Sequence, residues 1–297
     1  MSDQIADITD SPAEKLAGGF GFTEGPLWHP DGYWLFVDIQ KLQIHKMSAT
    51  GELETFRDPS FGTNGMTFDR QGNLVICESD NRQIMRRQAD GSYTAIATHV
   101  DGKRLNRPND IVGRSDGTLY FTDPGGRLSE EERELDYSGV HMIAPSGANS
   151  VGTTETEYPN GLAFSPDEKI LYVAITRLDS RCLEEKEKHQ MCEHQLIRAF
   201  DVAADGALSN NRVFASMASA ETGVPDGMKV DTLGRIFCTG SGGIWVFEPD
   251  GTHLGIIRGP EVPRNIAFGG PDFRTIYTTP GVSLYSFRVK TPGIRPY

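Results

Sequence analysis

A short polar phrase recurs six times along the chain, each time just before an apolar run typical of a β-strand. The residues at the equivalent position all carry a side-chain oxygen: Glu24, Asn64, Asn109, Asn160, Asp226 and Asn265. They are separated by 40, 45, 51, 66 and 39 residues. A repeat of roughly 40–50 residues is long enough for four short strands and their turns, and it is typical of β-propellers.

The turns between the apolar runs support the same fold. Five of them carry an Asp-Gly pair: Asp31-Gly32, Asp90-Gly91, Asp116-Gly117, Asp205-Gly206 and Asp250-Gly251. Such a pair between β-rich runs is a strong hairpin signal. Long helical periodicity is nearly absent. The sequence therefore predicts an all-β fold, a six-bladed β-propeller with four-stranded blades whose innermost strands line a central channel.

The 297 residues are predicted to form a single domain, because all-β domains of this length commonly form one unit. Residues 1–18 are expected to be an N-terminal extension, which either adds the outermost strand to the last blade or lies on the surface. The 66-residue interval predicts an inserted charged loop at 177–194.

The composition narrows the possible partners. A net charge of −12 disfavours binding to nucleic acid or to an anionic membrane surface. No run approaches 18 apolar residues, and the acidic N-terminus has no apolar signal-peptide core. We therefore expect a soluble cytoplasmic protein. An acidic surface and a closed propeller favour a monomer, and a homodimer stays open.

The four cysteines are Cys77, Cys182, Cys192 and Cys238, and none forms a Cys-x-x-Cys pair. This spacing excludes a zinc ribbon or a thioredoxin motif. In the cytoplasm all four are expected to be free thiols. Whether Cys182 pairs with Cys192 stays open.

The six repeated side chains precede the first strand of each unit, so they should meet at one mouth of the channel. Glu24, Asn160 and Asp226 offer two carboxylates and an amide oxygen, which are hard donors suited to a divalent cation. Asn109 adds another amide, and the guanidinium of Arg107 beside it can bind carbonyl or hydroxyl oxygens. The alternative is that these residues only cap turns, as Asn and Asp often do.

Other catalytic arrangements find little support. The seven histidines share neither a repeat position nor the i, i+4 spacing of metal ligands. His141 lies in an expected strand and is predicted to be a packed or edge residue rather than to act as a base. No Gly-x-Ser-x-Gly sequence occurs, so a serine hydrolase triad is not indicated.

Five motifs occur in order along the chain. They are Thr23-Glu24-Gly25-Pro26, Arg107-Pro108-Asn109-Asp110, Pro159-Asn160-Gly161-Leu162, Ser165-Pro166-Asp167 and Pro225-Asp226-Gly227-Met228. With these motifs, residues 15–290 resemble the regucalcin/gluconolactonase (senescence marker protein) family of propeller lactonases. Two further runs resemble its microbial gluconolactonase branch: Phe121-Thr122-Asp123-Pro124 and Ala267-Phe268-Gly269-Gly270-Pro271.

The resemblance implies a site with one divalent metal ion. The residues that match the metal ligands are Glu24, Asn160 and Asp226, and Asp226 also matches the residue assigned as general base. Arg107 and Asn109 match substrate-binding positions. The sequence does not specify whether the ion is Ca²⁺, Mg²⁺, Mn²⁺, Zn²⁺ or Fe²⁺.

The implied reaction is hydrolysis of a cyclic ester, such as an aldonolactone, to the hydroxy acid. The metal would polarise the carbonyl group while water attacks it with help from Asp226. A metal-bound carboxylate is a poor base, so either Asp226 uses its second oxygen or the metal acidifies the water. Asn64 and Asn265 would mark the repeat or support the ligands by hydrogen bonds. The alternatives are a metal-dependent hydrolase of other esters or organophosphates, and a non-enzymatic calcium-binding propeller.

Overall fold

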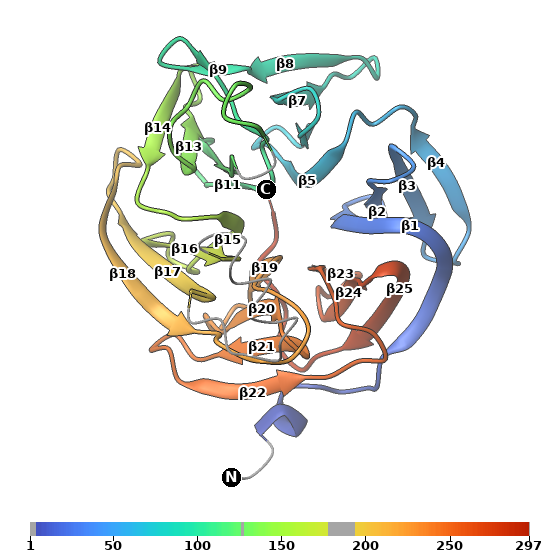
Figure 1. The fold of residues 1–297 in the computed structure, drawn as a ribbon. Coiled ribbons are helices and arrows are strands. Elements are labelled where there is room, and N and C mark those ends of the chain that lie inside the picture. The colour runs from blue at the N-terminus through green and yellow to red at the C-terminus, as the bar shows by residue number, and fades with distance from the viewer. Residues whose placement is uncertain (1–3, 126–127, 178–193, 297) are drawn as a thin grey trace.

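The computed structural model describes residues 4–125, 128–177 and 194–296. These residues form β-sheet almost throughout, with one short 3₁₀ helix, η1 (Gln4–Asp7), and no α-helix among them. They include four four-stranded antiparallel sheets, one seven-stranded sheet and one two-stranded sheet. The sheets are arranged around a central axis (Figure 1). The predicted all-β class, with four-stranded antiparallel sheets, is confirmed.

Each four-stranded sheet is built from four strands that are consecutive in the sequence. The first two sheets contain β5 (Thr63–Phe68), β6 (Leu74–Glu78), β7 (Gln83–Arg87) and β8 (Tyr93–Ala97), and then β11 (Ile111–Gly113), β12 (Leu119–Asp123), β13 (Gly139–Ile143) and β14 (Asn149–Thr153). The next two contain β15 (Pro159–Phe164), β16 (Ile170–Ile175), β17 (Leu196–Val202) and β18 (Leu208–Ser216), and then β19 (Met228–Val230), β20 (Ile236–Gly240), β21 (Gly243–Phe247) and β22 (His253–Ile257). The two-stranded sheet pairs β9 (His99–Val100) with β10 (Lys103–Arg104).

The seven-stranded sheet joins the two ends of the chain. Its order is β23 (Asn265–Gly269), β24 (Thr275–Thr279), β25 (Gly281–Arg288), β1 (Glu14–His29), β2 (Tyr33–Asp38), β3 (Gln43–Ser48) and β4 (Leu53–Arg57). The first part of β1, residues 14–18, pairs with β25, and the last part, residues 23–29, pairs with β2. Residues 14–18 thus lie beside β25 as an added strand.

The Asp-Gly turns adopt the geometry that their sequence predicts. Their glycines have φ values of +85° to +93°, in the left-handed region that glycine occupies at little cost: Gly32, Gly91, Gly117, Gly206 and Gly251. Each turn joins two paired antiparallel strands, so these five hairpins are confirmed.

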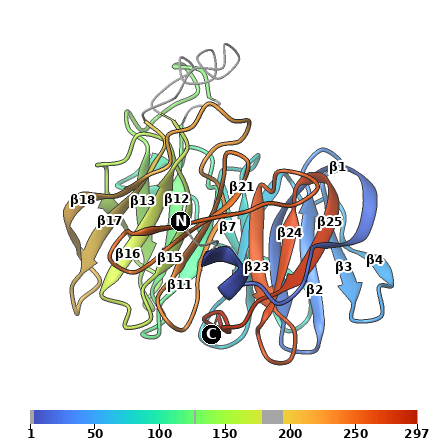
Figure 2. The ribbon, with the colours of Figure 1, turned by 90° about the horizontal axis from the view of Figure 1, so that it is seen from below.

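The first strands of successive sheets lie closest to the axis. Contacts run from β1 to β5, β11, β15, β19, β23 and back to β1, which closes a circle. Apolar side chains fill the space between the sheets, and the largest buried rings include Trp34, Tyr120 and Tyr172. The C-terminal segment crosses beneath the circle, where the N–H of Ile294 donates to the carbonyl oxygen of Val230 over 3.0 Å. Figure 2 shows the C-terminus at the lower end of the inner strands.

Some predictions fall on residues that the structure leaves undescribed. The expected loop at 177–194 lies outside the described residues except for Arg177 and His194 at its ends, and so do Cys182 and Cys192. Cys77 and Cys238 are buried free thiols, as expected. Among the described residues, no helix is long and apolar enough to cross a membrane.

Candidate active site

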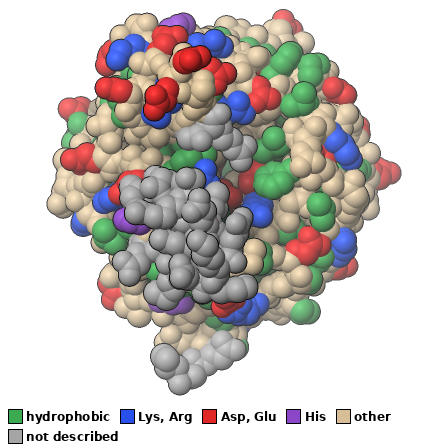
Figure 3. Space-filling view, in the orientation of Figure 1, with side chains coloured by type: hydrophobic (Ala, Val, Ile, Leu, Met, Phe, Trp, Pro, Cys, Tyr) green, Lys and Arg blue, Asp and Glu red, His purple; other side chains and the backbone are tan. Residues whose placement is uncertain are grey.

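A polar cavity of about 460 Å³ opens at the mouth of the channel where the inner strands begin. Its lining includes six of the seven residues predicted from the sequence: Glu24, Asn64, Arg107, Asn109, Asn160 and Asp226. Figure 3 views the molecule from the face with this mouth, where acidic and basic side chains lie close together. The seventh residue, Asn265, lies behind the lining and is almost fully buried.

Glu24 is more deeply buried than Asp226, the other carboxylate at this mouth, with 4% of the residue exposed. Burial raises the pKa of its carboxyl group to about 7. A hydrogen bond from the Asn265 side chain and one of 3.1 Å from the N–H of Gly25 oppose this shift. Asp110 also raises the pKa, and Arg264 lowers it. A carboxylate in this position gains from any cation that binds beside it.

The side-chain amide of Asn160 is oriented by Thr176. The Thr176 hydroxyl donates to the carbonyl oxygen of Pro225 over 2.8 Å, so towards Asn160 it can only accept. It therefore accepts from Nδ2 of Asn160 at 3.1 Å. This leaves the carbonyl oxygen Oδ1 of Asn160 as the atom available to a ligand in the cavity.

Asn265 is oriented in the opposite sense. Its Oδ1 accepts a 2.8 Å hydrogen bond from the N–H of Ile266, which turns the amide nitrogen towards Glu24. Asn160 and Asn265 thus differ in chemistry. Asn160 can offer an oxygen to a cation, whereas Asn265 donates a hydrogen bond to a carboxylate.

Among the described residues, three arginines line the cavity, and the sequence interpretation named only Arg107 of them as a binding residue. The guanidinium of Arg107 forms a 2.5 Å ion pair with Asp80. That of Arg177 lies over the ring of Tyr158, with 4.5 Å from Cζ to the ring centre. Arg264 could have been found from its place directly before the repeat position. Arginines suit carbonyl, hydroxyl and carboxylate oxygens because they present several donors in a fixed plane.

A steric reason, which the sequence did not reveal, explains why glycine often follows the repeated polar residue. A Cβ atom on Gly25 would overlap the backbone of Asn64, the repeat residue of the next unit. A Cβ on Gly161 would likewise overlap the backbone of Asp226, and one on Gly227 would overlap the Asn265 side chain. Glycine is therefore required where these copies of the phrase pack against the next, whereas Asp110 and Ile266 stand at this position in two other copies.

Hydroxyl groups link neighbouring units in the same circle. They come from the end of a second strand or the residue after it, and each donates to a backbone carbonyl at or next to the following repeat position. The bonds run from Ser79 to Pro108 (2.5 Å), from Thr122 to Asn160 (2.8 Å), from Thr176 to Pro225 (2.8 Å) and from Thr239 to Arg264 (2.7 Å). The sequence analysis missed these positions, although the recurrence of Ser or Thr there is a signal in the sequence.

The donor set at this mouth fits a divalent cation that prefers oxygen. Glu24 and Asp226 supply carboxylates, and Asn160 supplies the amide oxygen described above. In the described part of the chain, no cluster of three or more His, Cys, Asp or Glu side chains could hold a metal, so amide oxygens are needed to complete a site. Two carboxylates with amide oxygens are typical ligands for calcium or magnesium rather than for structural zinc.

Comparison with known proteins agrees with the fold. Residues 22–281 match the SMP-30/Gluconolactonase/LRE-like region. A gluconolactonase of Zymomonas mobilis is 29% identical over 98% of this chain and 85% of its own length. A pentonolactonase of Haloferax volcanii is 32% identical over 86% of this chain and 80% of its own length. The solved structure of a gluconolactonase from Xanthomonas campestris superposes with a TM-score of 0.83 at 31% identity, covering 96% and 92% of the two chains.

The match extends over most of the chain, and it includes the inner strands and every residue of the predicted site. The protein therefore belongs to the SMP-30/gluconolactonase family. This confirms the resemblance to regucalcin and gluconolactonase that the ordered motifs indicated. The individual roles of the site residues stay predictions.

Proposed function

We propose that this protein is a divalent-metal-dependent lactonase that hydrolyses a sugar lactone, such as an aldonolactone, to the hydroxy acid. The family and the relatives named as lactonases support a lactone-hydrolysing enzyme. The observation that carries the proposal is the buried Glu24, which shares a polar cavity with Asp226 and with the available oxygen of Asn160. Such a set of oxygen atoms gains most from a bound cation.

In the same proposal the fold is a six-bladed propeller formed by one domain. The circle of six inner strands supports this number. The seven-stranded sheet then counts as two blades that share β1. One is β23 to β25 with residues 14–18 of β1, and the other is residues 23–29 of β1 with β2 to β4.

The chemistry supplied by a bound divalent cation is Lewis-acid stabilisation of negative charge on the lactone carbonyl oxygen. The proposed holders are Glu24, Asn160 and Asp226. Asp226 lies partly exposed in the cavity wall and takes a proton from the attacking water. The new bond joins the water oxygen to the carbonyl carbon, the bond to the ring oxygen breaks, and the ring oxygen receives a proton. One water is consumed for each lactone.

The remaining residues of the cavity bind and orient the substrate. Arg107 and Asn109 reach the cavity from the segment before β11, and Arg264 reaches it from the segment before β23. Their donors suit the hydroxyl groups of a sugar lactone, and the guanidinium groups also suit the carboxylate of the product. Asn265 lies behind the lining and donates a hydrogen bond to Glu24, so Asn265 keeps Glu24 in place.

A pH-indicator assay tests the proposal directly, because ring opening releases an acid. Aldonolactones, aliphatic lactones, aryl esters and organophosphates are supplied to the metal-stripped protein, with Ca²⁺, Mg²⁺, Mn²⁺, Zn²⁺ or Fe²⁺ added singly. We expect turnover of aldonolactones that requires one of these ions. Equal turnover without metal would contradict the Lewis-acid role. Metal binding without any turnover would favour the non-enzymatic alternative, and turnover of only esters or organophosphates would identify the other hydrolase.

A further inference from the structure

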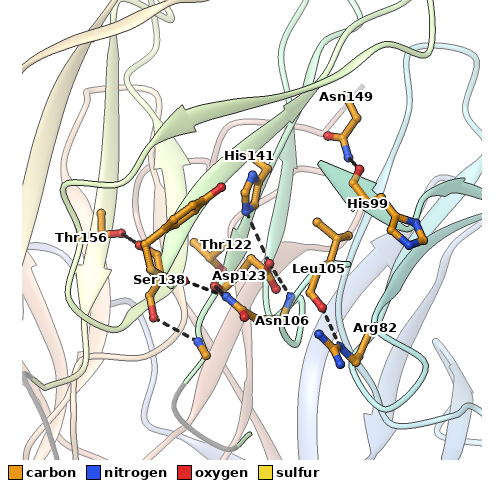
Figure 4. Close-up of polar contacts among 12 residues, drawn as sticks. Arg82, His99, Leu105, Asn106, Thr122, Asp123, Ser138, His141, Asn149 and Thr156 are labelled. Atoms are coloured by element: carbon orange, nitrogen blue, oxygen red, sulfur yellow. Dashed lines mark hydrogen bonds and ion pairs between the residues drawn. The ribbon is translucent and has the colours of Figure 1, made fainter. Parts of the chain in front are cut away.

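A fully buried carboxylate ends β12, the second strand of the sheet formed by β11 to β14. Asp123 is the last residue of β12 and is completely enclosed. Its Oδ2 accepts a 2.8 Å hydrogen bond from the backbone N–H of Asn106. The buried side chain of Asn106 donates in return to the backbone carbonyls of Asp123 (3.2 Å) and Tyr137 (2.9 Å). Figure 4 shows Asp123 and Asn106 facing each other between the strands. Two hydrogen bonds thus join Asp123 to Asn106, and a third holds the Asn106 side chain to the backbone of Tyr137.

His141 lies next to this pair on the neighbouring strand β13. It is also completely buried, and its Nε2 is 3.4 Å from Oδ2 of Asp123. Its ring packs against Phe121 and Tyr137, with centroid distances of 5.3 and 5.9 Å. A carboxylate enclosed in this way needs nearby polar partners, because burial without them is costly. His141 supplies one such polar partner from the neighbouring strand. It therefore acts as a packed residue rather than as a catalytic base.

The segment fixed by Asp123 leads directly into the candidate active site. Arg107 and Asn109 follow Asn106 by one and three residues, and both line the cavity. The neighbour of Asp123, Thr122, holds the same segment further along. Its carbonyl oxygen accepts from the N–H of Asn109 at 2.8 Å, and its hydroxyl accepts from the N–H of Asp110 at 3.0 Å.

The first repeat unit contains the same arrangement. Asp38 is the last residue of β2 and is completely buried. Its two oxygens accept hydrogen bonds from the backbone N–H groups of Gly21 (2.8 Å) and Phe22 (3.0 Å). These residues precede Glu24 by three and two positions, as Asn106 precedes Asn109 by three. The equivalent Glu78 at the end of β6 bonds instead to the side chains of Arg57, Asn81 and Gln83.

We propose that Asp38 and Asp123 are positioning residues for two different halves of the site. Asp38 fixes the segment that carries Glu24, and so it sets the affinity for the metal ion. Asp123, supported by Asn106 and His141, fixes the segment that carries Arg107 and Asn109, and so it sets the affinity for the substrate. The assignment of the two halves rests on the proposed function.

A matched control exists at the opposite end of the channel. Asp231 is completely buried, and its carboxylate accepts from the N–H groups of Leu233 (3.0 Å) and Arg235 (2.9 Å) and from Nε of Arg235 (2.7 Å). Like Asp38 and Asp123 it accepts hydrogen bonds from backbone N–H groups, but it does not line the cavity and its bonds go to residues outside the segments that lead there. Its removal should reduce stability alone.

The experiment compares Asp38→Ala, Asp123→Ala and Asp231→Ala. Metal affinity is measured by calorimetric titration with Ca²⁺, KM and kcat by lactone hydrolysis, and order by amide hydrogen exchange of residues 20–25 and 105–111. Losing a hydrogen bond to a charged group changes affinity by about tenfold or more. We expect Asp38→Ala to raise the calcium Kd by that factor and Asp123→Ala to raise KM by that factor. Asp231→Ala should lower only the melting temperature.

Two further variants separate positioning from folding. Asp123→Asn keeps an oxygen that accepts from the N–H of Asn106, so it should recover most of the substrate affinity. If Asp123→Ala does not fold, Asn106→Ala is measured in its place, and it should raise KM with an unchanged calcium Kd. The proposal is overturned if Asp123→Ala or Asn106→Ala matches Asp231→Ala in KM and in exchange of residues 105–111. It is equally overturned if Asp38→Ala leaves calcium binding unchanged.

These outcomes stay distinct from a failure of the proposed function. If the wild-type protein opens no lactone, the lactonase proposal fails, but hydrogen exchange and calcium titration still decide the positioning roles. Faster exchange at 105–111 in Asp123→Ala, with normal exchange at 20–25, would support the assignment of Asp38 and Asp123 to different halves of the site even without any turnover. Unchanged exchange at 105–111 would overturn it whatever the activity.

Discussion

The two ends of the channel are built by the same inner strands but differ in chemistry. At one mouth the strands begin with carboxylates and amides around a cavity of about 460 Å³. Further along the same strands, the lining of a cavity of about 100 Å³ includes apolar side chains: Leu27, Met66, Ile111, Leu162 and Ala267. There the C-terminal residues 294–296 contribute to the lining. A step of two or three residues thus changes the channel from polar to apolar.

Because of this difference, the apolar end contributes to the stability of the fold, whereas the polar mouth is suited to binding a ligand. The apolar end removes hydrocarbon surface from water, which stabilises the folded chain by roughly 25 cal/mol for each Å² buried. The polar mouth works in the other direction. The shift of the Glu24 pKa from 4.5 to about 7 corresponds to a cost of about 3 kcal/mol for the ionised group. A cation bound there would offset this cost.

The largest expected effect contrasts two aspartates, one at each end. Asp226→Asn should reduce lactone turnover by about 10²- to 10⁴-fold, because it removes the proposed proton acceptor. Asp231→Asn, at the apolar end, should leave kcat and KM unchanged. The comparison is made by steady-state kinetics at saturating metal. Full activity of Asp226→Asn would show that the polar mouth does not supply the base.

The repeat predicted the polar mouth well because its signal is local. The repeat puts an oxygen-bearing side chain within or just before each inner strand, at the same end of the channel, and turn glycines such as Gly32 and Gly91 fix the hairpins. The sequence did not show which amide offers oxygen and which offers nitrogen. That choice depends on Thr176 and on the N–H of Ile266, which only the folded chain brings into contact with Asn160 and Asn265.

The buried polar contacts in the sheet of β11 to β14 could not be predicted from the sequence either. His141 was correctly expected to be packed, since it lies in a strand and shares no repeat position. Its contact with Asp123 joins residues 18 positions apart in neighbouring strands. Arg264 was missed as a binding residue although it stands directly before the repeat position, whereas Arg177 lies outside the repeated phrase. The guanidinium of Arg177 reaches the cavity through the fold, and its place in the sequence carries no signal.

The next effect concerns protons at the polar mouth. A pKa of about 7 means that Glu24 in the metal-free protein holds its proton below pH 7. The stability gained from this proton is complete below pH 4.5 and is lost as the pH rises through 7. Metal must displace the proton, so its affinity should rise about tenfold for each pH unit between 5 and 7 and then level off. Calorimetry with Ca²⁺ in buffers from pH 5 to 8 measures this.

Glu24→Gln is the control for that titration. It should bind calcium weakly, with the steep dependence between pH 5 and 7 removed. Unchanged pH dependence in the variant would assign the proton to another group. Asp272→Asn, near the apolar end, should keep the wild-type profile.

A smaller effect is expected from matched glycine substitutions at the two ends. A Cβ on Gly227 would overlap the Asn265 side chain, and one on Gly293 would overlap the ring of Phe268. Each alanine variant should lose about 1–3 kcal/mol of stability through this crowding. Only Gly227→Ala should also weaken calcium binding, because displaced Asn265 no longer donates to Glu24. Thermal denaturation and calorimetry distinguish the two, and equal metal affinity in both would remove Asn265 from the site.

The smallest effect tests whether a surface ion pair matters only where it borders the cavity. Asp80 pairs with Arg107 at 2.5 Å, and Asp272 pairs with Arg288 at 2.5 Å, with the two aspartate side chains 45% and 47% exposed. Exposed pairs of this kind contribute about 0–1 kcal/mol to stability, so neither Asp80→Asn nor Asp272→Asn should shift the melting temperature measurably. Asp80→Asn frees a guanidinium of the cavity wall, and we expect KM to change by about two- to fivefold with kcat constant, within the same energy range. Asp272→Asn should leave both constants unchanged. If Asp80→Asn leaves KM unchanged as well, Arg107 is held by its backbone segment alone, and the restraint from Asp123 is then sufficient to place it.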